Sequence, residues 1–185
     1  MSTLFRLTGA EFDSMAEHGS FDVLGPKTIE LLHGELRFMN PAGPVHDDYI
    51  DYMNRWSMTN TSESIANIRV QSGFVCDDHR PEPDVVWLKP RRYGRTRPTA
   101  PDVLLLIEVS DSSLTIDLGE KADIYAQAGV DEYWVIDIPN QRLHRMLESD
   151  GKVYRTVDIL MPLQTPAPSC NPNAALNLAE LFEVH

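Results

Sequence analysis

The sequence lacks the features that mark several classes of protein. Its two cysteines, Cys76 and Cys170, form no CxxC or Cys/His ligand pattern, so neither a disulfide framework nor a zinc site is expected. No apolar run approaches the roughly eighteen residues that cross a bilayer, and the first residues carry neither the basic nor the long apolar segment of a secretory signal. We therefore expect a cytoplasmic protein without a membrane partner.

Positive charge is also scarce. Sixteen Lys and Arg residues face 28 Asp and Glu residues, which gives a net charge of -12 and argues against a protein that coats duplex DNA through its overall field. Basic residues gather in one stretch, KPRRYGRTRP, namely Lys89, Arg91, Arg92, Arg95 and Arg97. This stretch is either a solvated loop or a loop that faces phosphates.

Common enzyme signatures are missing too. The sequence contains no GxxxxGK phosphate loop, no GxGxxG fingerprint, no GxSxG elbow and no HExxH zinc motif. Its 185 residues are enough to bury a sizeable core, and a hydrophobic fraction of 42% is ordinary for a globular protein. One domain over residues 1–185 is the simplest interpretation.

Residues 101–137 form the most informative stretch. The run from Val103 to Ile107 has no polar alternation, which favours a strand buried on both faces. This strand ends at Glu108. We expect a helix capped by Asp117 that carries Lys121, and then a second apolar strand that ends at Asp137. The arrangement is a βαβ-like crossover, or an antiparallel return if the second strand lies at an edge.

The rest of the chain alternates between short helices and strands. The spacing predicts a helix over 8–19, a hairpin around His33, a helix from Pro44, a half-buried strand over Ile68–Cys76, a short strand over 84–88, hairpin strands over 142–160 and a closing helix over 175–182. These elements predict an α+β fold with an α/β-like core, in which a central mixed sheet is flanked by helices.

Two carboxylates at strand ends are the best candidates for chemistry. Asp84 and Glu108, with a backbone carbonyl between them, would make an all-oxygen site suited to Mg²⁺ or Mn²⁺. Lys121 has the chemistry to orient or deprotonate an attacking water. The alternatives are a strand-initiating turn for Asp84 and a surface ion pair for Lys121. Asp137 is better explained as a cap of the following turn.

Four blocks resemble a known family in their order: IELLHGELRFMNPAGPVH, PEPDVVWL, LLIEVSDSS and DLGEKADIYAQAGVDEYWVID. They are similar to the Uma2 (Uma-two) family of restriction-endonuclease-like proteins, within the PD-(D/E)xK nuclease superfamily. The resemblance runs from Thr8 to about Ile159. It implies a restriction-endonuclease-like fold, a divalent metal, a nucleic-acid substrate and a homodimer, in which two basic loops would form a groove.

The resemblance also implies roles for individual residues. Asp84 and Glu108 match the metal-binding carboxylates, Glu35 matches an early supporting carboxylate, and the carbonyl of Val109 would complete the metal's inner shell. The superfamily's lysine position holds Ser110, so Lys121 would be its relocated equivalent. A recurring family histidine matches His46, which would touch a phosphate or cap the following helix.

Three hypotheses follow. The first is a Mg-dependent nuclease that hydrolyses phosphodiester bonds of DNA. The second is a catalytically inactive nuclease-like module that binds or assembles, which the acidic charge and the Ser110 departure favour. The third is a metal-dependent hydrolase of another phosphorylated substrate, which suits an acidic surface better than a long duplex does.

Overall fold

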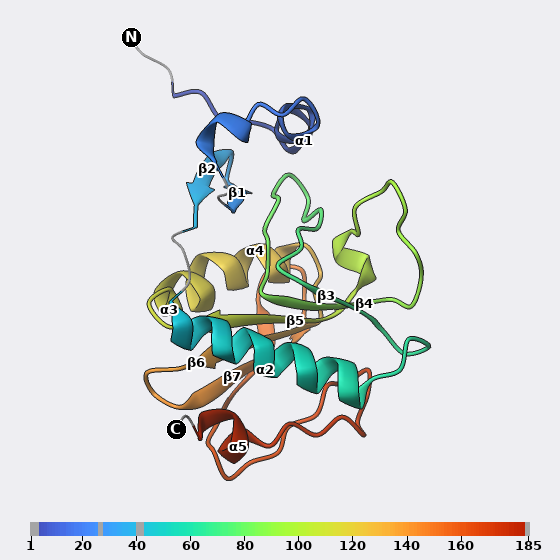
Figure 1. The fold of residues 1–185 in the computed structure, drawn as a ribbon, viewed down its shortest axis with the longest axis vertical. Helices are drawn as coiled ribbons and strands as arrows, with labels where there is room; N and C mark the ends of the chain where they lie inside the picture. Colours follow the sequence, from blue (N-terminus) through green and yellow to red (C-terminus); the bar gives the residue numbers. More distant parts are fainter. Residues whose placement is uncertain (1–3, 26–27, 40–42, 184–185) are drawn as a thin grey trace.

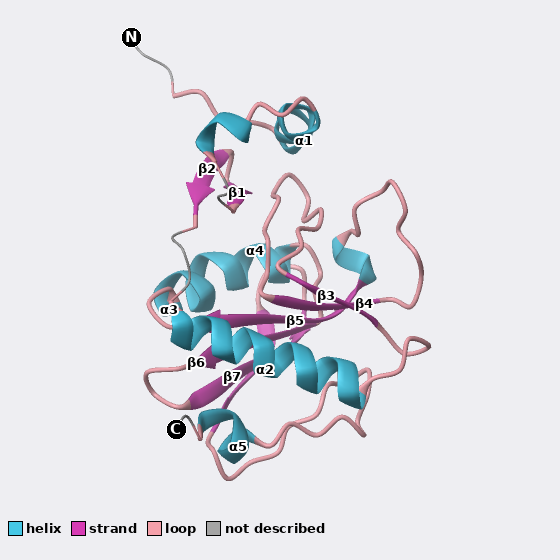
Figure 2. Cartoon of the chain, viewed as in Figure 1, coloured by secondary structure: helices cyan, strands magenta, loops and turns pink. Residues whose placement is uncertain are grey.

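The structure, a computed structural model, describes residues 4–25, 28–39 and 43–183. Its elements in chain order are α1 (Gly9–Glu17), η1 (Asp22–Leu24), β1 (Ile29–Leu32), β2 (Glu35–Phe38), α2 (Pro44–Asn60), β3 (Asn67–Val70), β4 (Val85–Leu88), η2 (Ala100–Asp102), β5 (Val103–Ser110), α3 (Leu114–Ile116), the π-helical turn η3 (Asp117–Lys121), α4 (Ala122–Gln127), β6 (Glu132–Asp137), β7 (Arg142–Ser149), β8 (Tyr154–Leu160) and α5 (Leu178–Phe182). Figure 1 labels most of them, and Figure 2 separates helices from strands.

The main sheet has the order β3-β4-β5-β6-β7-β8, and a separate hairpin pairs β1 with β2. Every neighbouring pair in the main sheet is antiparallel except β5 and β6, which run parallel. The segment α3–η3–α4 joins these two parallel strands, so the crossover form of the predicted strand-helix-strand unit is the one that occurs. The mixed sheet with flanking helices confirms the predicted α+β class.

Helices cover both faces of this sheet, with α2 on one side and α4 on the other (Figure 1). Trp87 and Ile107 pack into the same buried cluster as Trp56 of α2. Their neighbours in the strands point the other way, and Leu106 packs into a second cluster with Tyr125 of α4. This two-sided burial explains why β5 shows no polar alternation in sequence.

The N-terminal elements lie at the end of the molecule opposite to α5 (Figure 1). Thr8 caps α1 in a capping box with Glu11, as the sequence predicted. The backbones of Leu31 and Arg80 exchange two hydrogen bonds, of 3.2 and 2.9 Å, which tie the hairpin to the loop before β4. The hairpin thereby faces the end of the sheet where β4 begins.

Several sequence-based boundaries were wrong. The strand expected to end at Glu108 continues to Ser110, and the closing helix expected over 175–182 begins at Leu178. The strand expected over Ile68–Cys76 ends at Val70, because Gln71 adopts a φ of 45° and turns the chain out of the sheet. The helix expected to begin at Asp117 begins at Leu114, and Asp117 lies inside it. Among the described residues, every helix is too short or too polar to span a bilayer.

Candidate active site

The register of β4 and β5 brings the two predicted carboxylates together. Val85 pairs with Ile107 in an antiparallel ladder. One more step along that ladder places Asp84 opposite Glu108, and side chains at opposing positions share one face of the sheet. The side chain of Asp84 accepts a hydrogen bond of 2.8 Å from the backbone N–H of Val109 through Oδ2.

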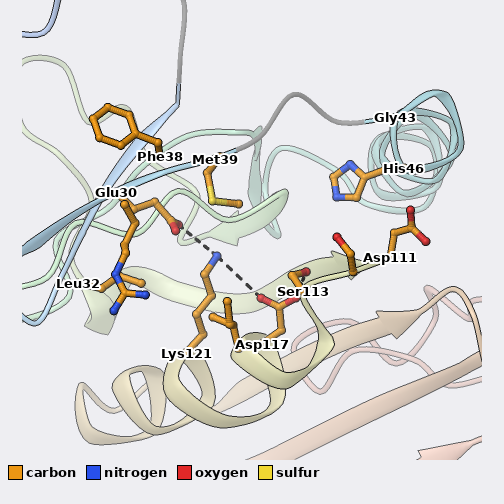
Figure 3. A pocket seen from close by; sticks show the side chains of 13 residues that line it. Glu30, Leu32, Phe38, Met39, Gly43, His46, Asp111, Ser113, Asp117 and Lys121 are labelled. Carbon is orange, nitrogen blue, oxygen red and sulfur yellow. Dashed lines mark hydrogen bonds and ion pairs between the residues drawn. The ribbon is translucent and has the colours of Figure 1, made fainter. Parts of the chain in front are cut away.

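Lys121 reaches the same place from the crossover helix. Its side chain is 3% exposed, and its Nζ lies 3.0 Å from Glu108 Oε1, 3.1 Å from Glu30 Oε1 and 4.0 Å from Asp117 Oδ1. Figure 3 shows the ammonium pointing between the carboxylates of Glu30 and Asp117. Burial alone lowers the pKa of Lys121, but the three carboxylates outweigh burial and raise the pKa above its ordinary value. The side chain is therefore an ammonium at neutral pH.

Glu108 occupies an environment that disfavours its charge. The residue is 3% exposed, and its Oε1 accepts hydrogen bonds from Lys121 Nζ and from the hydroxyl of Tyr125, at 3.0 and 2.8 Å. Burial raises the pKa of Glu108 well above its usual range, Lys121 offsets this only in part, and the carboxylates of Asp84 and Asp117 raise it further. The cluster thus holds more carboxylates than cations.

Glu30 belongs to this cluster, although we assigned it no role from sequence. It is 1% exposed on β1, and its Oε1 also accepts a hydrogen bond of 2.8 Å from the backbone N–H of Glu82. A signal for it exists in the sequence. Glu30 stands between the apolar residues Ile29 and Leu31, and a carboxylate inside a buried strand requires a charged or hydrogen-bonding partner.

Glu35, the predicted supporting carboxylate, lies elsewhere on the same hairpin. Its side chain is 41% exposed and pairs with Arg6 and Arg37, both at 3.2 Å. Arg37 also reaches Glu120 at 3.2 Å. No hydrogen bond or ion pair joins Glu35 to Lys121 in the part of the chain that the structure describes.

The π-helical turn η3 carries both Asp117 and Lys121. Asp117 Oδ2 accepts hydrogen bonds from the hydroxyls of Ser110 and Ser113, the latter at 2.5 Å. Ser110, two residues after Glu108, thus holds the carboxylate of Asp117, which lies 4.0 Å from Lys121 Nζ. Turns of this kind are rare and occur frequently at functional sites.

His46 lies at the N-terminal end of α2 and faces Asp84. Its Nε2 is 3.6 Å from Asp84 Oδ2, and the hydrogen bond to Asp84 raises the pKa of His46 even though burial lowers it. No donor or acceptor within the described ranges meets its buried Nδ1. The N-cap of α2 is Gly43, and no side chain caps the helix. His46 therefore contacts Asp84 and does not cap α2.

A pocket of about 410 Å³ opens over this cluster. Side chains from the hairpin, the start of α2 and the loop after β5 line it, as Figure 3 shows; among them are Glu30, His46, Asp111, Ser113, Asp117 and Lys121. The pocket therefore opens on the side chains of Lys121, Glu30 and Asp117, whereas Asp84 and Glu108 are not among the residues that line it.

The donor set suits a hard divalent cation. Glu108 accepts its hydrogen bonds through Oε1, and Asp84 accepts its own through Oδ2. Glu108 Oε2 and Asp84 Oδ1 accept no hydrogen bond from any residue that the structure describes. These two free oxygens come from opposing positions of adjacent strands. Excess negative charge and oxygen ligands are what Mg²⁺ and Mn²⁺ require. Among the described residues, however, no three His, Cys, Asp or Glu side chains already form a metal-binding group.

Some cations of the basic loop form ion pairs within the protein, and others do not. Arg91 forms an ion pair of 2.7 Å with Asp102, and its guanidinium lies over the ring of Tyr93. Arg97 points back toward Asp13 of α1, at 3.9 Å. Lys89, Arg92 and Arg95 form no ion pair with any residue that the structure describes. The loop is therefore only partly neutralised by the protein itself.

Comparisons with known proteins concern the family and the fold of the chain. The model of the Uma2 family, described as "Putative restriction endonuclease", matches residues 15–179. The crystal structure of "a putative nuclease belonging to DUF820" from Anabaena variabilis superposes with a TM-score of 0.75, covering 95% of this chain and 97% of that one at 16% identity. At that identity the likeness concerns the fold alone.

A search among curated proteins found no match. The family match nevertheless spans most of the chain, and it includes Asp84, Glu108 and Lys121. The predicted resemblance and the predicted fold are both confirmed. The chain belongs to the Uma2 family of restriction-endonuclease-like proteins.

Proposed function

We propose that this protein is a metal-dependent nuclease that hydrolyses phosphodiester bonds of DNA, with residues 1–185 acting as one restriction-endonuclease-like domain. One observation carries the proposal. Asp84 and Glu108 stand on opposing strand positions, each with a free carboxylate oxygen, and Lys121 contacts Glu108 at 3.0 Å. Two carboxylates and one lysine held together beside a pocket are the parts that this chemistry needs.

Asp84 and Glu108 would hold a Mg²⁺ or Mn²⁺ ion, with the carbonyl of Val109 as a further ligand. Such an ion lowers the pKa of a bound water and neutralises charge on a phosphate. Glu30 supports the site better than Glu35 does, because Glu30 is buried and contacts Lys121 directly, whereas Glu35 is paired with Arg6 and Arg37.

Lys121 acts through its positive charge. Its pKa is raised by the surrounding carboxylates, so it is a poor acceptor for the proton of the attacking water. An ammonium in the pocket can instead orient that water and stabilise the negative charge that develops on the phosphate. His46 is the second group that can face a phosphate, since it lines the pocket and its pKa is also raised.

The test is cleavage of labelled single- and double-stranded DNA by the pure protein with Mg²⁺, Mn²⁺ or EDTA. We expect metal-dependent cleavage that Asp84→Asn and Glu108→Gln each reduce by about a thousandfold, the factor that roughly 4 kcal/mol of lost transition-state stabilisation represents. Asp158→Asn is the matched control, because that carboxylate is partly exposed on β8 and pairs with Arg145.

Two outcomes would sink the proposal. Cleavage that persists in EDTA or in both site variants would come from other residues or from a contaminant. A protein that binds neither metal in calorimetry and cleaves nothing would be the inactive binding module instead. We also propose a cytoplasmic homodimer, and light scattering on the eluting protein would contradict this if it gave the 20.9 kDa mass of one chain.

A further inference from the structure

A second pocket lies on the other side of the loop that leads into β4. It also measures about 410 Å³, and its lining includes Arg69 of β3, Arg95 and Arg97 of the basic loop, and Gln71 and Glu82. Arg69 lies outside the basic stretch in sequence. Its strand brings it to the same hollow as the two loop arginines.

The arginines of this pocket outnumber its carboxylates, since Glu82 is the one acidic side chain in the lining and lies within electrostatic reach of Arg97. Arg69 and Arg95 form no ion pair with any described carboxylate, and the contact of Arg97 with Asp13 is a long one of 3.9 Å. The chain as a whole carries a net charge of -12. Three guanidinium groups around one carboxylate leave a local excess of positive charge on an acidic protein, which favours an anion.

Neighbouring residues hold two of these guanidiniums in place. Arg69 lies over the buried ring of Tyr93, with 5.0 Å from its guanidinium carbon to the ring centroid. Arg97 packs against Gly73, where an added Cβ would come within 2.9 Å of an Arg97 nitrogen. Stacking and packing restrict the arginine side chains without neutralising their charge, which lowers the entropy lost when they bind a ligand.

The pocket shares a wall with the candidate active site. Glu82 lines the pocket, and its backbone N–H donates to Glu30 Oε1, which contacts Lys121. Gln71, also in the lining, donates its backbone N–H to the carbonyl of Asp84 at 2.9 Å. Glu82 and Asp84 are two residues apart in the chain, so the arginine pocket and the carboxylate cluster are neighbours.

We propose that Arg69, Arg95 and Arg97 bind a backbone phosphate of the nucleic-acid strand that is cut, next to the phosphate held at Asp84, Glu108 and Lys121. This inference rests on the proposed nuclease function. It also predicts the path of the nucleic-acid strand, which would run over residues 82–84 from the arginines to the carboxylate cluster. Arg91 and Arg92 line a different hollow with residues 58–68 and stay outside this subsite.

The experiment measures binding of a fluorescent ten-nucleotide oligothymidylate by anisotropy, in EDTA and over a range of salt concentrations. We expect Arg69→Ala, Arg95→Ala and Arg97→Ala each to weaken binding about tenfold, as the loss of one charge-assisted contact does. Each should reduce the slope of log affinity against log salt by about 0.7, the value for one phosphate of a single strand.

Arg92→Ala and Arg155→Ala are the matched controls. Arg92 belongs to the same loop but lines the other hollow, and Arg155 is 69% exposed on β8. Both controls should keep the wild-type affinity and slope to within about twofold, apart from the general loss of one surface charge. Equal losses in controls and pocket variants would overturn the subsite, as would a wild-type protein that does not bind the oligonucleotide.

Competition and cleavage separate this inference from the proposed function. Inorganic phosphate that displaces the oligonucleotide at millimolar concentration would instead mark a site for a small free anion. Asp84→Asn should reduce cleavage about a thousandfold while leaving oligonucleotide binding within about threefold, since Asp84 forms no contact with the three arginines. A protein that cleaves nothing but loses binding in the three pocket variants would keep the subsite and lose the nuclease. Cleavage by the wild-type protein, with unchanged binding in the three pocket variants, would keep the nuclease and exclude the subsite.

Discussion

Glu108 and Asp137 stand at the ends of the adjacent parallel strands β5 and β6, and both are buried, at 3% and 0% exposure. Their chemistry is opposite. Asp137 accepts hydrogen bonds from Asn140, Arg142 and His144, and although burial alone raises its pKa, these donors lower the pKa below its ordinary value. Glu108 shares one ammonium with two other carboxylates, and its pKa is raised.

The difference teaches how to distinguish a structural carboxylate from a functional one. The donors to Asp137 come from the next turn and strand, within seven residues of it, so the local chain satisfies it completely. The partners of Glu108 arrive from a hairpin and a crossover helix and leave the cluster short of positive charge. Shifts in pKa that local structure does not compensate are typical of functional sites.

The largest expected effect separates activity from stability. Glu108→Gln should reduce cleavage about a thousandfold and change the free energy of unfolding by less than about 1 kcal/mol, because it removes a charge that burial disfavours. Asp137→Asn should leave cleavage intact and cost about 1.5–3 kcal/mol, the value of lost bonds to charged groups. Cleavage kinetics measure the activity of the two variants, and urea unfolding at pH 7 measures their stability. Equal stability losses in the two variants would show that Glu108 and Asp137 do not differ in this way.

The next effect concerns the single ammonium of the cluster. Lys121→Met leaves Glu30, Glu108 and Asp117 buried without a cation, and should lower the free energy of unfolding by about 3–5 kcal/mol at pH 8. The pKa values of Glu108 and Asp117 are already raised by burial, and the ammonium is what lowers them.

The pH dependence of this variant has a definite sign. Without Lys121 the folded-state pKa values rise further above the unfolded ones, so the folded state binds more protons and gains relative stability as pH falls. The deficit relative to wild type should therefore shrink between pH 8 and pH 5 in urea unfolding. Lys152→Met, at an exposed position, is the control. A deficit that is constant with pH would mean that lost packing, and not lost charge, causes it.

A smaller effect compares two glutamates of one hairpin. Glu30→Gln should reduce the rate of cleavage about 10- to 100-fold, as the loss of a supporting group beside a metal site does. Glu35→Gln should change it by less than about twofold, since Glu35 pairs with surface arginines. Both variants keep the shape of the side chain. A larger loss of cleavage rate in Glu35→Gln than in Glu30→Gln would show that Glu35 is the supporting carboxylate.

The smallest effect concerns the hydrogen bonds that hold the carboxylate of Asp117. Ser113→Ala removes a hydroxyl that bonds the Asp117 carboxylate at 2.5 Å, and should cost about 1 kcal/mol of stability with little change in cleavage. Ser112→Ala, at the exposed neighbouring position, should cost nothing measurable. Thermal unfolding resolves the two, and identical midpoints would show that Ser110 alone holds Asp117.

Much of this architecture follows from local patterns in the sequence. The unbroken apolar run of β5 predicted a strand covered on both sides, as the structure has it, although the strand continues two residues beyond Glu108. The spacing of Lys121 and Tyr125 predicted one shared helix face, and both side chains contact Glu108. Periodicity captures such features because they depend on neighbours close in the chain.

The features that sequence reasoning missed depend on distant parts of the chain. Glu30 joins the site only because the hairpin docks beside β4 through Arg80, and no local pattern encodes that docking. Asp117 has the residue type and spacing of a helix cap, but Ser110 and Ser113 already supply donors to its carboxylate, so the helix begins one turn earlier. Arg69 escaped attention because it lies outside the basic stretch.

The hairpin that supplies Glu30 also affects when this site can form during synthesis. Glu30 leaves the ribosome long before Lys121, and the intervening loop must close before the two side chains meet, at an entropic cost that grows with loop length. Contacts so distant in sequence form late in folding. In the proposed nuclease, a growing chain that stops short of η3 has the carboxylates without their ammonium. Such an incomplete chain therefore lacks the cation that balances the buried carboxylates of the full cluster.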